Sequence, residues 1–136
     1  MKKTGNIILT NMCMLYRKDG SFLVENRKKQ DWPGLNFPGG HVEKDESILH
    51  SVIREIQEET GLTVEDPEFV SYYEWNLPEE GVRHLCLLFR ASKWRGELHS
   101  SKEGEVFFIT KNDLASYSLA TDFEKILAIC SQGLTI

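Results

Sequence analysis

An acidic segment constrains this chain more than any other feature. It follows a glycine pair and reads "GGHVEKDESILHSVIREIQEETGL" at residues 39–62. Between residues 41 and 66 there are eight acidic and two basic residues, a net charge of −6, whereas the whole chain of 136 residues carries −5. The rest of the chain is therefore nearly neutral, and any structure must accommodate one concentrated block of carboxylates.

The acidic segment contains a predicted helix at residues 47–60. Ser47 is a residue type that favours the N-cap position, and Gly61 stands where helices commonly end. At about 100° per residue, four apolar residues share one arc that is expected to face a core. They are Leu49, Val52, Ile53 and Ile56.

Three glutamates fall together on the neighbouring arc of this helix. Glu55, Glu58 and Glu59 stand at positions i, i+3 and i+4, so their carboxylates should point the same way. Arg54 can neutralise one of them, but a divalent cation can neutralise all three. Hard cations such as Mg²⁺ prefer carboxylate and carbonyl oxygens, and Gly39 could expose a backbone carbonyl beside them. The segment therefore predicts a metal site, with a solvated acidic helix face as the alternative.

The flanking segments predict a mixed sheet with helices on both sides, in one domain covering residues 1–136. Turn-forming residues separate β-prone runs, and Asp19-Gly20 predicts a hairpin. The expected strands are 6–17, 22–27, 69–77, 83–94 and 105–110, with a shaped loop or broken strand at 31–40, a helical turn at 111–117 and a closing helix at 121–132, capped by Thr121 or Asp122.

The composition excludes some classes of function. A pI near 5.4 argues against a surface for long nucleic acids, because phosphate contacts need clustered basic residues. Cys13, Cys86 and Cys130 show no C-x-x-C spacing and are expected to be buried, reduced thiols of a cytoplasmic protein. No segment approaches the roughly 18 apolar residues needed to span a membrane.

The acidic segment resembles the Nudix box, G-x5-E-x7-R-E-U-x-E-E-x-G-U, in which U is aliphatic. Gly40, Glu46 and the run "REIQEETGL" at residues 54–62 match every fixed position. "FPGG" before the box and "GEVFFI" after it resemble the MutT-like branch. The resemblance implies an α/β/α sandwich with a mixed central sheet, and an enzyme that hydrolyses nucleoside diphosphate derivatives with Mg²⁺ or Mn²⁺.

The resemblance also implies roles for individual residues. Glu55, Glu58 and Glu59 would bind the metal together with the Gly39 carbonyl, Arg54 would orient a box glutamate, and Glu46 would support the loop before the helix. A further acid from a later loop would act as metal ligand or general base. Glu103 and Glu105 are both candidates, with Glu103 favoured by its "KEG" context.

Substrate selection lies outside the box. Arg27, with Lys28 and Lys29 beside it, could hold the phosphates, and Tyr16, Trp32 and Phe37 could stack on a base, although aromatic residues of small domains are more often core. MutT-like enzymes that act on 8-oxo-dGTP read the base with an Asn before the last helix. The corresponding "SLATDF" has none, so Thr121 and Asp122 are the nearest polar candidates. The four histidines show no metal-ligand spacing.

Two functions follow as hypotheses. The first is a diphosphatase that cleaves a purine nucleoside triphosphate, for example 8-oxo-dGTP, to the monophosphate and pyrophosphate, as a monomer or homodimer. ADP-ribose, dinucleoside polyphosphates or 5′-triphosphorylated RNA are alternative substrates. The second is a catalytically silent nucleotide sensor, against which the complete set of box acids argues.

Overall fold

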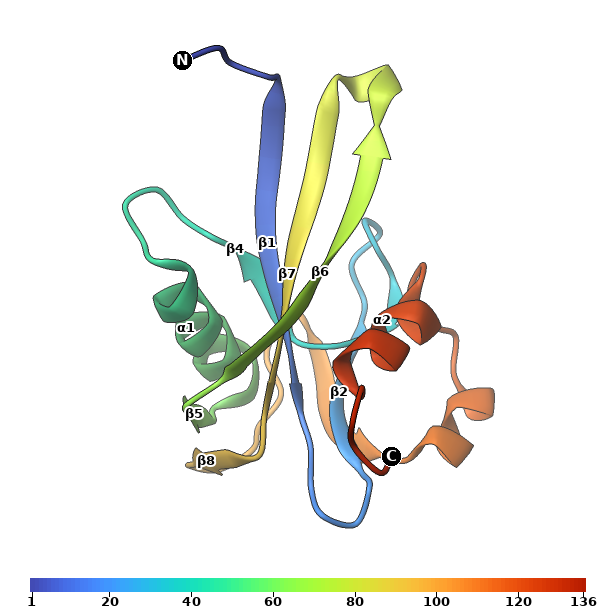
Figure 1. Cartoon of the computed structure of the whole chain (residues 1–136). Coiled ribbons are helices and arrows are strands. Elements are labelled where there is room, and N and C mark those ends of the chain that lie inside the picture. Colours follow the sequence, from blue (N-terminus) through green and yellow to red (C-terminus); the bar gives the residue numbers. More distant parts are fainter.

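The computed structural model describes residues 1–136, and Figure 1 shows their arrangement. Nine strands and two α-helices form the fold, with two short 3₁₀ helices, η1 and η2. The strands are β1 (Asn6–Leu15), β2 (Phe22–Arg27), β3 (Gly34–Asn36), β4 (Gly39–His41), β5 (Thr63–Glu65), β6 (Glu68–Leu77), β7 (Val82–Ala91), β8 (Lys93–Arg95) and β9 (Gly104–Ile109). The helices are α1 (Ile48–Thr60), η1 (Pro78–Glu80), η2 (Lys111–Ser116) and α2 (Phe123–Cys130).

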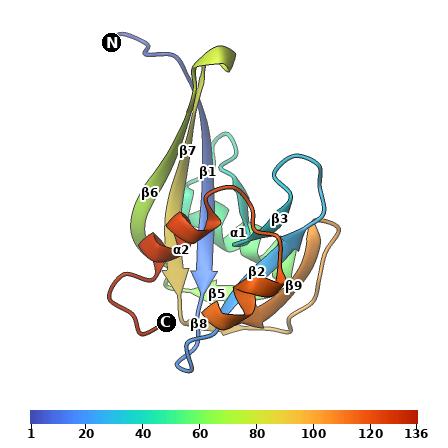
Figure 2. The same cartoon turned by 90° about the vertical axis from the view of Figure 1, so that its right-hand side faces the viewer.

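The main sheet is mixed, as predicted. Its strand order is β4-β1-β7-β6, with β1 parallel to β7 and the other neighbours antiparallel. A second sheet, β3-β2-β9, is antiparallel, and β5 pairs with β8. Figure 2 shows the long strands β1, β6 and β7 side by side, with the second sheet next to one half of their length.

The predicted hairpin at Asp19-Gly20 is wrong in its pairing. The chain does turn there, since the Gly20 N–H donates to the Arg17 carbonyl, but β1 and β2 then diverge into different sheets. A single bridge between Tyr16 and Phe22 links them. Local turn chemistry gave the reversal correctly, whereas the partners of each strand depend on segments far along the chain.

Two cores lie on opposite faces of the sheets, because side chains alternate along each strand. On β1, Cys13 and Leu15 belong to the core under α1, and Met14 belongs to the core under α2. Helix α1 packs against β1, β4 and β5, whereas α2 packs against β6 and β7. Figure 1 shows the two helices on opposite sides of the sheets. The predicted α/β/α sandwich is confirmed.

Helix α1 has the predicted ends but a different buried arc. The Ser47 side chain accepts from the His50 N–H, and Gly61 adopts the left-handed conformation at the C-terminal cap. Val52 and Ile56 are fully buried, but Leu49 is 49% exposed, which corrects its predicted place in the core. The core-facing arc instead includes Glu59, so one carboxylate of the helix points toward the protein interior.

Other predictions are confirmed or refined elsewhere in the chain. β6 and β7 form the predicted long hairpin, but the second strand ends at Ala91, and residues 93–95 form the unpredicted β8. Asp122 occupies the N-cap position of α2 without capping it through its side chain. The three cysteines are free and buried. None of the helices is both long and apolar enough to span a membrane.

Candidate active site

A cavity of about 640 Å³ opens beside the N-terminal half of β1 and the inward face of α1. Its lining includes acidic side chains from five separate elements or loops, and aromatic side chains from β6 and from the segments before and after β3. One region of this lining holds four of the acids and two bases, namely Glu25, Glu55, Glu59, Glu103, Arg27 and Lys29. We call this region the acidic end of the cavity.

Arg54 organises the box glutamates. Its Nη1 donates to Glu55 Oε1 at 2.9 Å and to Glu58 Oε2 at 3.2 Å, and its Nε and Nη2 donate to the two oxygens of Glu46 at 2.6 and 3.0 Å. A further bond from Nη2 to the His41 carbonyl ties the guanidinium to β4. Since this bidentate pairing favours the charged form, the pKa of Glu46 falls to about 2. Arg54 therefore fixes the loop before α1 against the helix.

The three box glutamates do not share one environment. The side chain of Glu58 is 56% exposed and that of Glu55 is 16% exposed, whereas Glu59 is buried. The expected single arc of three equivalent carboxylates is thus corrected to a gradient from solvent to core. Burial raises the pKa of Glu55 despite its bond to Arg54.

Glu59 lies against a carboxyl group that the sequence interpretation missed. Glu25 of β2 is 2% exposed, and its Oε2 has no hydrogen-bond partner. Burial is the main cause that raises the pKa of Glu59 far above its usual range, and the negative charge of the adjacent Glu25 is the second cause. Burial also raises the pKa of Glu25. Two close carboxylates in a dry setting cannot both ionise easily, so the metal-free pair holds a proton at neutral pH.

The glycine pair at the start of the box lets backbone and helix approach closely. The Gly39 N–H donates to Glu59 Oε2 at 2.9 Å. A Cβ at Gly39 would collide with the Asn11 carbonyl oxygen, and one at Gly40 would lie 2.5 Å from the Glu55 carboxyl carbon. Gly39 is therefore required for β4 to pair closely with β1, whereas a side chain at Gly40 would displace the Glu55 carboxylate.

The structure separates the two candidate loop acids. Glu103 lines the acidic end and accepts from Lys29 Nζ at 2.8 Å, with Arg27 Nη1 at 3.9 Å. Glu105 is exposed on β9 and does not line the cavity. Lys28 is exposed and likewise lies outside the lining. Arg27 and Lys29 thus stand beside the acids, where a phosphate chain would need positive charge.

The other end of the cavity is aromatic. Trp32 and Trp75 meet edge to face with ring centroids 4.7 Å apart, and His84 packs on Trp75 at 5.0 Å. Thr10 Oγ1 lies 2.8 Å from His84 Nε2. The Trp32 indole N–H is buried without an acceptor. We call this region the aromatic end. It combines the flat rings of Trp32 and Trp75 with the Trp32 N–H, a hydrogen-bond donor that has no acceptor.

The predicted base-binding residues are placed unevenly. Phe37 lines the cavity, but Tyr16 and Thr121 do not. Asp122 lies behind the wall, where its Oδ2 accepts from Trp75 Nε1 at 2.9 Å, so it positions an aromatic ring. His41 and His84, to which the sequence assigned no role, also line the cavity.

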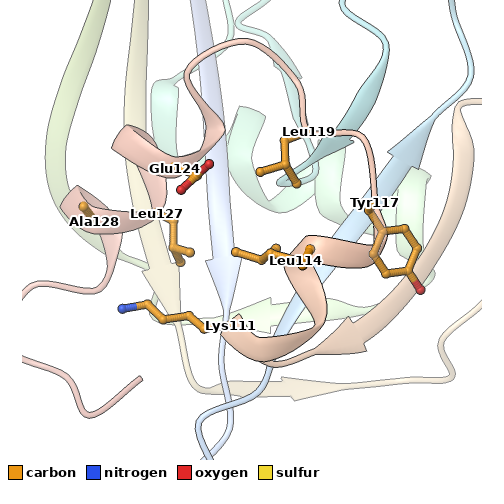
Figure 3. A pocket seen from close by; sticks show the side chains of 8 residues that line it. Lys111, Leu114, Tyr117, Leu119, Glu124, Leu127 and Ala128 are labelled. Carbon is orange, nitrogen blue, oxygen red and sulfur yellow. The ribbon is translucent and has the colours of Figure 1, made fainter.

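A second hollow of about 680 Å³ lies between η2 and α2 and is mostly apolar (Figure 3). Leu114, Leu119 and Leu127 form much of its wall, with Lys111 and Glu124 as its charged residues. It contains none of the box acids and no clustered titratable groups, so the chemistry belongs to the first cavity.

The acidic end suits a hard divalent cation in the chemistry of its donors. Carboxylate oxygens predominate, and Glu25 Oε2 is a buried oxygen without a partner. However, no three of the His, Cys, Asp and Glu side chains converge closely enough to hold an ion as they stand. Glu55 and Glu58 bond Arg54 instead, so metal binding requires these side chains to rotate.

Comparison with known proteins agrees with this geometry. The NUDIX domain family matches residues 9–128. The 8-oxo-dGTP diphosphatase of Buchnera aphidicola is 38% identical over 73 residues, which are 54% of this chain and 55% of that protein. Phosphatase NudJ of Escherichia coli is 31% identical over 72 residues, 53% of this chain and 46% of that protein. The chain spans about half the length of the curated relatives it matches.

Solved structures share the whole fold. The MutT protein from Bacillus halodurans is 27% identical with a TM-score of 0.76, covering 93% of this chain and 85% of that chain. The MutT NUDIX hydrolase from Burkholderia pseudomallei has a TM-score of 0.79 at 21% identity, covering 91% and 98%. This chain belongs to the Nudix domain family, and its fold is that of MutT-like members.

Proposed function

We propose that this protein is a metal-dependent diphosphatase that cleaves a purine nucleoside triphosphate into a nucleoside monophosphate and pyrophosphate. One observation carries the proposal. A single cavity has carboxylates and adjacent basic side chains at its acidic end and aromatic side chains at its aromatic end. A nucleotide has the same division, with an anionic chain at one end and a flat base at the other. The partial match to an 8-oxo-dGTP diphosphatase supports this class of substrate.

The acidic end would hold Mg²⁺ or Mn²⁺ through Glu55, Glu58 and Glu59, with Glu103 and the Gly39 carbonyl as further ligands. When bound, such an ion neutralises phosphate charge and makes a water molecule more acidic. Arg27 and Lys29 would hold the phosphate chain, and Glu103 beside them would accept the proton of the attacking water. A bond forms from water to the β-phosphorus, and the bond to the oxygen that bridges the α- and β-phosphorus atoms breaks.

The aromatic end would hold the base. Stacking on Trp32 or Trp75 is tolerant of base identity, so selectivity must come from polar groups. The buried Trp32 N–H lacks an acceptor, and the ring carbonyl oxygens of guanine or 8-oxoguanine are acceptors. A hydrogen bond from the Trp32 N–H to such a carbonyl oxygen would favour an oxo-purine over adenine.

The test is a Mg²⁺-dependent hydrolysis panel of canonical and oxidised nucleoside triphosphates, ADP-ribose and dinucleoside polyphosphates. Glu58→Gln serves as the inactive control. We expect pyrophosphate release from an oxo-purine triphosphate to exceed that from the others by at least about tenfold, a difference of about 1.4 kcal/mol. No hydrolysis of any compound, with nucleotide binding retained, would favour the silent sensor instead.

A further inference from the structure

Glu25 is a carboxylate of the cavity that the box does not contain. It lies on β2, the central strand of the second sheet, opposite Asn36 of β3 and Val106 of β9. The side chain is 2% exposed, and its Oε2 has no hydrogen-bond partner. A buried carboxylate oxygen without a partner is costly, so its presence here indicates a group that binds it in the working protein.

The cations of the protein leave this carboxyl group unpaired. Arg54 bonds Glu46, Glu55 and Glu58, while Arg27 and Lys29 pair with Glu103. Neither Glu25 nor Glu59 takes part in any ion pair, although the two carboxyl groups lie next to each other. The most buried part of the acidic end therefore has no direct ion pair, and the nearest positive charges, Arg27 and Lys29, pair with Glu103 instead.

The backbone on either side fixes how the pair can respond. One oxygen of Glu59 accepts the Gly39 N–H, which holds that side chain beside β4. Glu25 is held by strand pairing on both edges of β2. The Glu59 carboxyl group is thus held by the Gly39 backbone, and the backbone of Glu25 is fixed beside it by a different element.

We propose that Glu25 is an additional ligand of the divalent cation, which it binds together with Glu59. This proposal rests on the metal dependence in the proposed function, but it adds a ligand from outside the Nudix box. A cation there would occupy the unpartnered oxygen of Glu25 and remove the repulsion within the pair. A purely structural role would need only a polar group of the same shape at this position.

The test measures Mn²⁺ affinity of the full chain by electron paramagnetic resonance of free Mn²⁺, without nucleotide. Glu25→Gln keeps the shape and polarity but removes the ligand charge. We expect it to weaken Mn²⁺ binding about 10- to 100-fold. Glu105→Gln is the matched control, since Glu105 is an exposed glutamate on the neighbouring strand β9, and its affinity should equal that of the wild type. Equal affinity in Glu25→Gln would overturn the proposal.

A measurement on the wild type keeps the proposal testable if Glu25→Gln does not fold. The side-chain carboxyl ¹³C resonance of Glu25 should shift on Mg²⁺ saturation, whereas that of Glu105 should not. An unmoved Glu25 resonance would overturn the proposal. If the wild type binds no Mn²⁺ at all, the proposed function fails as well; if it binds Mn²⁺ and hydrolyses nucleotide with Glu25 uninvolved, only this inference fails.

Discussion

The acidic and aromatic ends of the cavity differ in how their residues are spaced along the chain. Glu55 and Glu59 stand four residues apart on one helix, with Arg54 beside them. Trp32, Trp75 and His84 come from three separate segments. The box carboxylates of the first end are thus fixed by one local helix geometry, whereas the residues of the second end can change without disturbing that helix. We therefore expect catalysis and base selection to respond to different substitutions.

The largest expected effect is at Glu58, the box glutamate of α1 that lies outside the cavity lining. Glu58→Gln removes a carboxylate with little change of shape, and the side chain is 56% exposed. We expect kcat to fall by at least about 100-fold while the melting temperature stays close to that of the wild type. Steady-state kinetics at saturating Mg²⁺ would measure this. Near wild-type turnover would remove Glu58 from the metal site.

A substitution at the aromatic end should act on nucleotide binding instead. Trp75→Leu removes the ring that contacts both Trp32 and His84. Stacking on a base contributes about 1–3 kcal/mol, so KM should rise about tenfold with Mn²⁺ affinity unchanged. Tyr72→Leu is the matched control, because Tyr72 is an exposed aromatic residue on the same strand. A fall in Mn²⁺ affinity with Trp75→Leu would break the division between the two ends.

Asp122 should have a smaller effect of the same kind. Asp122→Ala removes the acceptor of the Trp75 indole N–H and frees that ring to move. We expect a KM increase of a few-fold and an altered ratio of kcat/KM between bases, with metal dependence unchanged. Asp122→Asn keeps a carbonyl acceptor and should restore most of the loss. Equal losses for every base would exclude a role in base selection.

A separate expected effect is on stability, and it depends on pH. The usual carboxyl pKa of 4.5 applies to the unfolded chain, and folding raises the pKa of Glu59 to about 10. Between these values the folded state binds the extra proton, so stability should fall as pH rises. Thermal melts of metal-free protein from pH 5 to pH 9 measure the slope. The slope of stability against pH should be smaller in Glu59→Gln. An unchanged slope would show that other groups cause the pH dependence.

The parts of the structure that were predictable are those set by short-range spacing. Ser47 and Gly61 mark the ends of α1, and the box positions predicted the α1 carboxylates of the acidic end. Glu25 was missed because it follows the apolar run 22–24 in a strand, and neither its burial nor its contact with Glu59 can be read from local pattern. A charged residue that directly follows an apolar run inside a strand was the available signal.

Strand partners and the aromatic end were beyond local reasoning for the same physical reason. The turn at Asp19-Gly20 predicted a hairpin, yet β1 pairs with β4 and β7. Asp122 was expected to read a base, but its carboxylate bonds Trp75, 47 positions away. Such contacts form only when distant segments pack together, and one sequence does not show which segments these are.

The most direct test of the two-ended site is a crystal structure of the protein with Mn²⁺ and a non-hydrolysable purine nucleoside triphosphate. We predict anomalous Mn²⁺ density among Glu55, Glu58 and Glu59, with the base against Trp32 and Trp75. A base bound in the apolar hollow between η2 and α2, or a Mn²⁺ ion away from the α1 carboxylates, would contradict the account.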